Sequence, residues 1–541
     1  MRESGNETPE LKSNRRRSLG ALFRIPLSAR SPDYHSISTS KPVGSVPADI
    51  IREIVDLLSP ADILSFSLTS KSLHTLLLPP LYDSVALRSS RKCESTLELL
   101  GQRPDLCALI RKLAVRPNYY LAWPKPDKPL DEEWVASKIA KIAPYLTSLN
   151  TFDWDGLEVP VDVLWSTLRT CCPDLRHVFC NVGALPLNPE SQLFRFSDLK
   201  SFSLIVRYGL GGTELFPPLE DLPDEFWEMI LHRCPDLEEL AVCSFSSCTR
   251  IFDVLRVTEG HWPSLNSLTL GSFGYQSDFT LGPADDQALA DFLEDHSTLQ
   301  FIRLQWNFKR WMSPSDIPMH LPKTALPKLD TFIGIYQQLA ELPNPGSIET
   351  LDLTCEPLHE SRLETICPIL QNLTSLTCLD IWAHVRAPNQ DHNNLFYSIL
   401  SSCPKLTDFH FMCTTSFTFK PLKQLLTQLH LLPDLKRFSL TKGHQYRDES
   451  MLQSALHIMT HSRGLKQINI RWAREKSPNH LKQEGTYDIT HDDRGRPVAL
   501  MVVERGIPLL GPPFYRRYKH KIKAHRVVSS LKPAKLIQLL S

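Results

Sequence analysis

Residues Cys234–Val242 read C-P-D-L-E-E-L-A-V, and this pattern decides the fold. Side chains of a β-strand point alternately to its two faces, so Leu240 and Val242 share one face and predict a short strand with one buried side. Pro235 disfavours helical geometry in the residue before it, which indicates that a helix ends there. The stretch therefore predicts a helix, a proline stop and a strand in succession.

The apolar-x-x-apolar-x-apolar part of this stretch recurs along most of the chain. Successive copies are separated on average by about 30 residues, which is near the period of leucine-rich repeats. One copy alone is a weak signal, but the regular recurrence predicts a stack of similar units. The copies begin at Ile110, Leu149, Leu175, Leu199, Leu237, Leu265, Leu299, Leu329, Ile348, Leu376, Leu406, Leu435 and Leu465.

A helical pattern precedes many of the copies, so each unit is expected to contain a helix and a strand. Stacked units of this kind place a parallel sheet on one face and helices on the other, which is an α/β solenoid. The cysteines of the C-P motifs, Cys172, Cys234 and Cys403, are interpreted as small buried apolar groups rather than nucleophiles. Helices are expected at Val161–Thr170, Asp224–Arg233, Asp285–Asp295, Leu363–Gln371, Asn393–Ser402 and Leu422–Leu429.

A different pattern, between Val46 and Tyr82, predicts a small helical module. Apolar residues recur at helical spacing after Pro47, and Ser59-Pro60 separates a first helix from a second. Pro79-Pro80 is expected to stop the helical run. A unit of about 40 residues supports little core of its own. The module is therefore either a helical cap on the following domain or a unit whose remaining apolar face binds a partner.

The module resembles an F-box in its Val-Pro opening, its isoleucine row, the segment S-P-A-D-I-L, Thr69–Lys71 and the closing P-L-Y. Leu73 stands where many family members have tryptophan, and the opening is Val-Pro rather than Leu-Pro. The resemblance implies binding to the Skp adaptor of a cullin–RING ubiquitin ligase. The adaptor-binding residues implied by position are Pro47, Ile50, Ile51, Ile54, Leu57, Leu58, Leu64 and Leu68.

The repeats resemble a leucine-rich repeat array of the irregular kind that often follows an F-box. They depart from that family in the asparagine expected after each strand, which occurs only at Asn118 and Asn307. Two long steps between copies contain the segments Trp123–Pro129 and Gly209–Pro218. The second is expected to form an insertion loop at one rim of the array.

The composition excludes several classes of protein. The 541 residues include 60 basic and 60 acidic ones, so no bulk charge favours nucleic acid or a membrane as a partner. The 13 cysteines form no C-x-x-C pair, which argues for reduced thiols and against a structural metal. No apolar run is long enough to cross a bilayer and no signal peptide is recognisable, so a cytoplasmic or nuclear location is expected.

The two ends of the chain are expected to differ from the array. Residues 1–44 are rich in Ser, Arg and Pro without a period, which is typical of disorder. Thr486–Thr490 and Val498–Val503 alternate around a polar turn and predict a hairpin that forms a polar cap. The expected domains are a disordered segment at 1–44, an F-box at 45–90, the repeat array at 91–480, and a hairpin cap with a basic tail at 481–541.

No catalytic constellation is recognisable, since the chain has neither a glycine-rich phosphate loop nor a nucleophile elbow. The functional surface is expected at strand positions that point away from the core, because exposed Trp and Arg often anchor interfaces. The alternative for each Trp is that it turns back to cover the edge of the core. The hypothesis places Arg303, Trp306, Trp382 and Trp472 on one client-binding surface.

With the F-box resemblance, these features predict the substrate-recognition subunit of a Skp–cullin–F-box ubiquitin ligase. The adaptor would bring the cullin and RING subunits, and the array would hold an unknown protein client. Such a subunit contributes proximity and specificity, is not an enzyme and needs no cofactor. The alternatives are a repeat scaffold without ubiquitin transfer and a regulatory binding protein.

Overall fold

The computed structural model describes most of the chain between residues 47 and 506. The predicted disorder at 1–44, the insertion loop at Gly209–Pro218, Trp306, Asn307 and the basic tail all lie outside the described residues. These are 47–58, 60–87, 89–118, 129–183, 185–206, 219–244, 251–271, 283–305, 321–385, 391–413, 417–443, 449–461, 464–474 and 477–506.

The described strands form one 16-stranded sheet whose order follows the chain, with β6 and β8 set apart as a separate pair. Neighbouring strands are parallel up to β16, whereas β17 and β18 are antiparallel. The strands are β1 (Ser84–Leu87), β2 (Lys112–Val115), β3 (Thr151–Trp154), β4 (His177–Val182), β5 (Ser201–Val206), β6 (Leu219–Asp221), β7 (Glu239–Ser244), β8 (Ile251–Asp253), β9 (Ser267–Gly271), β10 (Phe301–Gln305), β11 (Thr331–Ile333), β12 (Thr350–Leu358), β13 (Cys378–Ala383), β14 (Asp408–Cys413), β15 (Arg437–Gly443), β16 (Gln467–Arg474), β17 (Ser477–His491) and β18 (Pro497–Gly506).

Helices or helical turns connect most of these strands, and the predicted helices are found within a few residues of their expected bounds. Helix α8 continues as a π-helical turn at Met229–Arg233. The α-helices are α1 (Ala48–Asp56), α2 (Pro60–Ser67), α3 (Lys71–Tyr82), α4 (Ser90–Gln102), α5 (Pro104–Cys107), α6 (Glu132–Ile142), α7 (Asp162–Cys171), α8 (Asp224–Glu228), α9 (Pro283–Asp295), α10 (Tyr336–Ala340), α11 (Leu363–Gln371), α12 (Asn393–Ser401), α13 (Phe419–Gln428) and α14 (Met451–His461).

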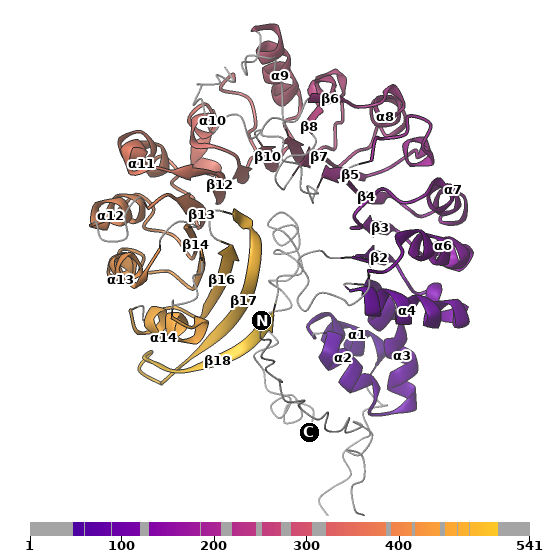
Figure 1. Ribbon diagram of the computed structural model, residues 1–541, viewed down its shortest axis with the longest axis horizontal. Coiled ribbons are helices and arrows are strands. Elements are labelled where there is room, and N and C mark those ends of the chain that lie inside the picture. The colour runs from indigo at the N-terminus through magenta and orange to yellow at the C-terminus, as the bar shows by residue number, and fades with distance from the viewer. Residues whose placement is uncertain are drawn as a thin grey trace, which may run out of the picture.

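The elements form an open ring with the strands on its inner side and the helices on its outer side (Figure 1). Helices α1–α3 lie at one end of the ring and the β17–β18 hairpin at the other, and the two ends face each other across the opening. One continuous core, from Leu87 to Ile489, lies between strands and helices. It contains Leu240 and Val242, as the alternation predicts. The predicted α/β solenoid, with a parallel sheet and helices on opposite sides, is confirmed.

A repeated backbone hydrogen-bond pattern joins the repeats. The carbonyl oxygen of the residue before each strand accepts the N–H groups of two consecutive residues in the next repeat. Arg111 O, for example, accepts from Asn150 N and Thr151 N at 2.8 and 2.9 Å. The pattern continues without interruption from Asp83 to Lys436, so the strands of successive repeats start in one common register.

The cysteine that ends the helix in each C-P motif lies three residues before the leading leucine of its repeat. Cys172, Cys234 and Cys403 are all buried there. Burial raises the pKa of the Cys172 and Cys403 thiols to about 12. These thiols stay protonated at neutral pH, in agreement with their interpretation as apolar groups.

His296 occupies the same position in the repeat that leads to β10. Its ring is buried, Nε2 accepts the N–H of Trp262 at 3.0 Å, and Nδ1 lies 2.7 Å from the carbonyl oxygen of Phe292. This arrangement requires a neutral ring with its proton on Nδ1. Burial accordingly lowers the pKa of His296 below its usual range.

The junction between the helical module and the array differs from expectation. Helix α3 does not stop at Pro79-Pro80 but continues to Tyr82, and β1, which lies within the expected F-box range of 45–90, already belongs to the sheet. Tyr82 explains both differences, because it ends α3 and also takes the place of the leading leucine of a repeat. Asn118 also has another role than expected, since its side chain bonds the backbone of Leu130.

We predict that His296 makes the array sensitive to acid. The folded protein disfavours the protonated ring, so the free energy of unfolding falls as the pH drops below about 6.5, where His of the unfolded chain binds a proton. Substitution of His296→Leu costs about 1–3 kcal/mol at pH 8, because the N–H of Trp262 loses its acceptor. This cost should shrink as the pH falls from 8 to 5, as measured by urea unfolding. His261→Leu, at an exposed ring nearby, is the control. A cost that is constant over this range contradicts the prediction.

Candidate protein-docking surfaces

Helix α1 carries apolar side chains over a continuous arc of roughly 160°, at about 100° per residue. Half of this arc packs into the module's own core through Ile51, Val55 and Leu58. The other half faces outward, and Ile50 and Leu57 are 45% and 53% exposed. Charged residues cover the opposite side of the helix. Helix α1 therefore has more apolar surface than the module can bury by itself.

This division corrects two of the predicted adaptor-binding residues. Ile51 and Leu58 pack against leucines of α3 in the core of the module, so they are not accessible to a partner. Ile54 is half-buried at the border between core and surface, and Pro47, the N-cap residue of α1, is exposed. The correction follows from packing, because periodicity alone does not tell which half of an apolar arc faces the rest of its own module.

Helix α2 extends the exposed apolar surface. Leu64 and Leu68 are 51% and 73% exposed and stand one turn apart, whereas Ile63 between α1 and α3 is buried. Side chains separated by four residues lie on the same side of a helix. We refer to Ile50, Leu57, Leu64 and Leu68 as the outward apolar set.

Helix α3 joins the module to the array without a linker. Its first turns contribute leucines to the module's core, while Leu78 and Tyr82 pack against the core of the array. Asp83 follows directly, and its carbonyl oxygen accepts the N–H groups of Arg111 and Lys112 at 3.0 and 2.9 Å. The end of the module is thus also the first step of the backbone ladder, which fixes the orientation of the two parts.

The second candidate surface is the inner face of the sheet, which is the face opposite the core. Arg303 of β10 and Trp382 of β13 lie on this face, but both side chains are buried. Trp472 of β16 packs against the core on the other face, so it does not belong to the predicted client surface. Arg471 and Trp472 are consecutive and point to opposite faces, which explains this correction. Trp306 lies outside the described residues.

Charged side chains of the inner face pair with partners one repeat away. Asp408 of β14 and Arg437 of β15 form an ion pair, in which Arg437 Nη2 is 2.7 Å from Asp408 Oδ2. Arg471 Nε of β16 donates to Glu484 Oε1 of β17 at 2.8 Å. Such pairs were not predicted, although the sequence holds a signal. The motifs L-T-D-F and L-K-R-F place opposite charges at one repeat position.

His410 continues this polar row toward the middle of the array. It lies on β14 between two neighbouring strands, with Nδ1 2.9 Å from Asp380 Oδ2 and Nε2 2.8 Å from Thr441 Oγ1. The polar groups from β13 to β17 are therefore largely engaged with each other. A partner that binds this face has to fit or replace existing pairs.

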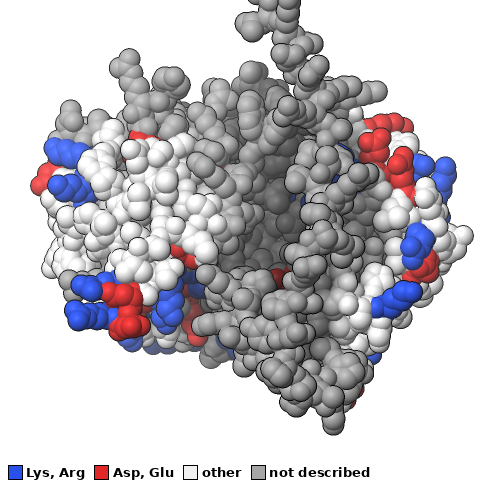
Figure 2. Space-filling model, turned by 90° about the horizontal axis from the view of Figure 1, so that it is seen from below, with Lys and Arg blue, Asp and Glu red and all other residues white. Residues whose placement is uncertain are grey.

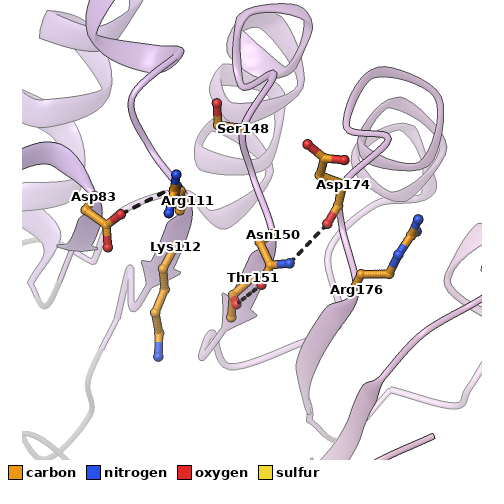
Figure 3. A pocket seen from close by; sticks show the side chains of 8 residues that line it. All are labelled: Asp83, Arg111, Lys112, Ser148, Asn150, Thr151, Asp174 and Arg176. Carbon is orange, nitrogen blue, oxygen red and sulfur yellow. Dashed lines mark hydrogen bonds and ion pairs between the residues drawn. The ribbon is translucent and has the colours of Figure 1, made fainter. Parts of the chain in front are cut away.

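A pocket of about 550 Å³ opens at the rim beside the junction of α3 and β1 (Figure 3). Arg111 Nε lies 3.8 Å from Asp83 Oδ1, and Asn150 Nδ2 donates to the carbonyl oxygen of Asp174 at 3.3 Å. Charges of both signs thus face the same space, which favours no particular ligand class. The lining consists of Asp83, Arg111, Lys112, Ser148, Asn150, Thr151, Asp174 and Arg176.

The described charges on the face viewed in Figure 2 do not form a patch of one sign. Figure 2 shows acidic and basic side chains intermixed on both flanks of the viewed face. Within the described ranges, no group of three or more His, Cys, Asp or Glu is placed to hold a metal ion. Nor does that part of the chain contain a helix that is long and apolar enough to span a membrane.

Comparison with known proteins identifies the N-terminal module. Residues 45–80 match the F-box domain family, so the chain carries an F-box domain. A search of curated proteins found no match to the chain. Among solved structures, a chain of the crystal structure of the Rad7 and Elc1 complex in yeast is 12% identical with a TM-score of 0.38, covering 77% of this chain and 97% of its own.

The leucine-rich repeat-containing protein LegL7 from Legionella pneumophila is also 12% identical, with a TM-score of 0.30. The match covers 77% of this chain and 98% of LegL7. Because these similarities are low, the description of the array as leucine-rich-repeat-like rests on its own period, strand order and backbone ladder.

A buried ion pair lies on the core side of the sheet, between β15 and α14. Lys442 of β15 is fully buried, and its Nζ lies 2.8 Å from Glu449 Oε1, which also accepts from Ser454 Oγ at 2.8 Å. Burial raises the pKa of Glu449, but the hydrogen bond and charge of Lys442 outweigh this and hold the pKa below its usual range.

We predict that Lys442→Met lowers the free energy of unfolding by about 3–5 kcal/mol, because it leaves the Glu449 carboxylate without its buried partner. The double variant Lys442→Met/Glu449→Leu should recover part of this loss, since it also removes the orphaned charge. Urea unfolding of both variants checks the prediction. A double variant that is less stable than the single one speaks against a coupled pair.

Proposed function

We propose that this F-box-containing chain is the substrate-recognition subunit of a Skp–cullin–F-box ubiquitin ligase. The outward apolar set on α1 and α2 is the observation that supports this most directly, because it lies within the stretch that matches the F-box family. A Skp-type adaptor would cover this set and connect the chain to the cullin and RING subunits.

Burial of the outward apolar set supplies the driving force for adaptor binding. Complete burial of an exposed Leu or Ile side chain contributes about 1.5–3 kcal/mol. The four side chains of the set retain roughly half or more of their exposure in the free chain. The gain from several such side chains exceeds the ordering cost of a preformed helix pair and supports a stable complex.

The role of the array is to hold a protein client at a defined place. The continuous junction of α3, Asp83 and β1 fixes the array relative to the adaptor-binding end. A client held by the array is then positioned relative to the ubiquitin-loaded enzyme of the ligase. The rate gain comes from this proximity, so the chain itself provides no reacting group and uses no cofactor.

Arg303 and Trp382 have a supporting role in this proposal. Both lie on the inner face that we propose to contact the client, but their burial leaves little surface for direct contact. Arg437 provides the most accessible charge of the polar pairs on the same face, because its side chain is 34% exposed, whereas its partner Asp408 is buried.

The alternative is a scaffold or regulatory protein whose array binds a partner without ubiquitin transfer. The identity of the protein that binds the outward apolar set distinguishes these possibilities. A ligase subunit co-purifies with cullin as well as the adaptor, and it shortens the lifetime of its client. A scaffold does neither.

We predict that the double variant Ile50→Asp/Leu57→Asp does not bind a Skp-type adaptor. Two carboxylates in an apolar interface cost several kcal/mol, which is enough to dissociate a micromolar complex. The measurement is size-exclusion chromatography of the chain co-expressed with the adaptor. Both positions are exposed, so the module should still fold, unlike after substitution of the buried Leu58.

A matched control is Val163→Asp, which introduces the same charge at a 63% exposed apolar position of α7. This variant should bind the adaptor like the parent chain. Absence of a complex with the parent chain itself would mean that the module is a structural cap, and the scaffold would become the better explanation.

We also predict that a flexible Gly-Ser insertion between Tyr82 and Asp83 slows ubiquitin transfer without affecting adaptor binding. The adaptor should still bind, because the outward apolar set is unchanged. Ubiquitin transfer to a bound client should slow about tenfold or more, because the client is no longer held at one distance from the enzyme. Reconstituted ubiquitination with purified subunits measures this effect, and equal rates would argue against a rigid junction.

A further inference from the structure

The sheet has two edge strands of different length. At one edge, β1 is four residues long, and α3 and α4 pack against it. At the other edge, β18 is ten residues long, α14 packs against it, and within the residues described here no strand pairs with its outer side. Such an edge presents unpaired N–H and C=O groups that can pair with a further strand.

The side chains of β18 do not protect this edge. The hairpin was expected to form a polar cap, but Val498, Met501 and Val502 of its outer strand are 59%, 50% and 51% exposed. No charged residue occurs from Pro497 to Val502, whereas proteins commonly blunt free edges with lysines or a covering element. The first six residues of β18 are therefore uncharged, whereas Glu504 and Arg505 lie at its end.

The middle of β18 has the regular geometry that an added strand requires. Residues 499–502 pair with Thr490, Ile489, Asp488 and Tyr487 of β17 in unbroken register. The irregularities in this pairing lie on either side of that stretch. A regular, twisted strand whose inner side is held by β17 offers its outer side as a template.

We propose that the outer edge of β18 binds an extended, uncharged segment of the client as one more strand of the sheet. Main-chain hydrogen bonds provide the affinity, and alternate apolar side chains of the client pack beside Leu500 and Val502, which share one face of the sheet. This inference rests on the proposed function, because it states how the array holds its client.

A single client strand fits this edge better than a second copy of the chain. A stable interface between two proteins buries about 1,200 Å² or more, whereas β18 offers one strand with three exposed apolar side chains. In Figure 1 the hairpin faces α1–α3 across the opening of the ring. A second copy that paired with β18 would have to fit its own repeat array beside this opening. An added strand extends the sheet by only about 5 Å.

The test uses the full chain bound to a Skp-type adaptor and a phage-displayed library of random decapeptides. Selected peptides are synthesised with a fluorescent label, and their binding is measured by anisotropy. We expect peptides with alternating apolar residues and no internal proline. The variant Val498→Lys/Val502→Lys should bind them at least about tenfold more weakly, which corresponds to about 1.4 kcal/mol. The control Val163→Lys should bind them like the parent chain.

Each other outcome overturns the proposal. No enriched peptide, or peptides that bind the β18 variant as tightly as the parent, removes the edge as a docking site. A doubled mass in light scattering that the β18 variant abolishes identifies a second copy as the occupant. Displacement of the selected peptides by a synthetic peptide of residues 507–541 identifies this chain itself. Adaptor binding is measured in parallel, so a failed proposal about the edge is distinguished from a failed F-box assignment.

Discussion

The carbonyl oxygen in front of each strand accepts two N–H groups from the next repeat, and the remaining structure depends on this repeated contact. It forces every strand to start at the same level, so apolar side chains of successive repeats meet in one core. Each repeat bonds only its two neighbours, which makes the stability of the array a sum of local terms. Such an array needs an end structure on both sides, since its terminal repeats have one neighbour only.

The two ends meet this need in different ways, and each way has a functional consequence. At the start, α3 supplies the first step of the ladder through Asp83 and also completes the core of the F-box. The end structure of the array is thus part of the F-box module, and no separate linker segment lies between them. At the other end, the antiparallel hairpin covers β16 but leaves the outer side of β18 as a new edge.

The sequence is sufficient to predict features that recur, because periodicity averages over many weak signals. All strands that begin with the apolar motif were predicted from β2 to β16, and so were helices α7, α8, α9, α11, α12 and α13. It is less informative where one residue has two roles. Tyr82 ends a helix and begins a repeat, so the helix seemed to stop early and β1 was missed. Similarly, Trp472 was assigned to a surface by residue type and Ile51 by its position in the F-box resemblance, whereas a shift of one position decides which face each of them takes.

Under the proposed function, the pairing of charges on the inner face also restricts how a client would be recognised. Asp408 with Arg437, and Arg471 with Glu484, each satisfy a partner one repeat away, so their net electrostatic attraction for an approaching protein is small. Breaking such a partly buried pair costs free energy, because each charge is left partly desolvated without its partner. Only a binding protein with charges at matching positions can offset this cost. This face therefore favours selectivity over affinity. Binding affinity then has to come from surface that is both apolar and able to form new main-chain hydrogen bonds. In the described part of the array, the outer side of β18 combines exposed apolar side chains with a free strand edge.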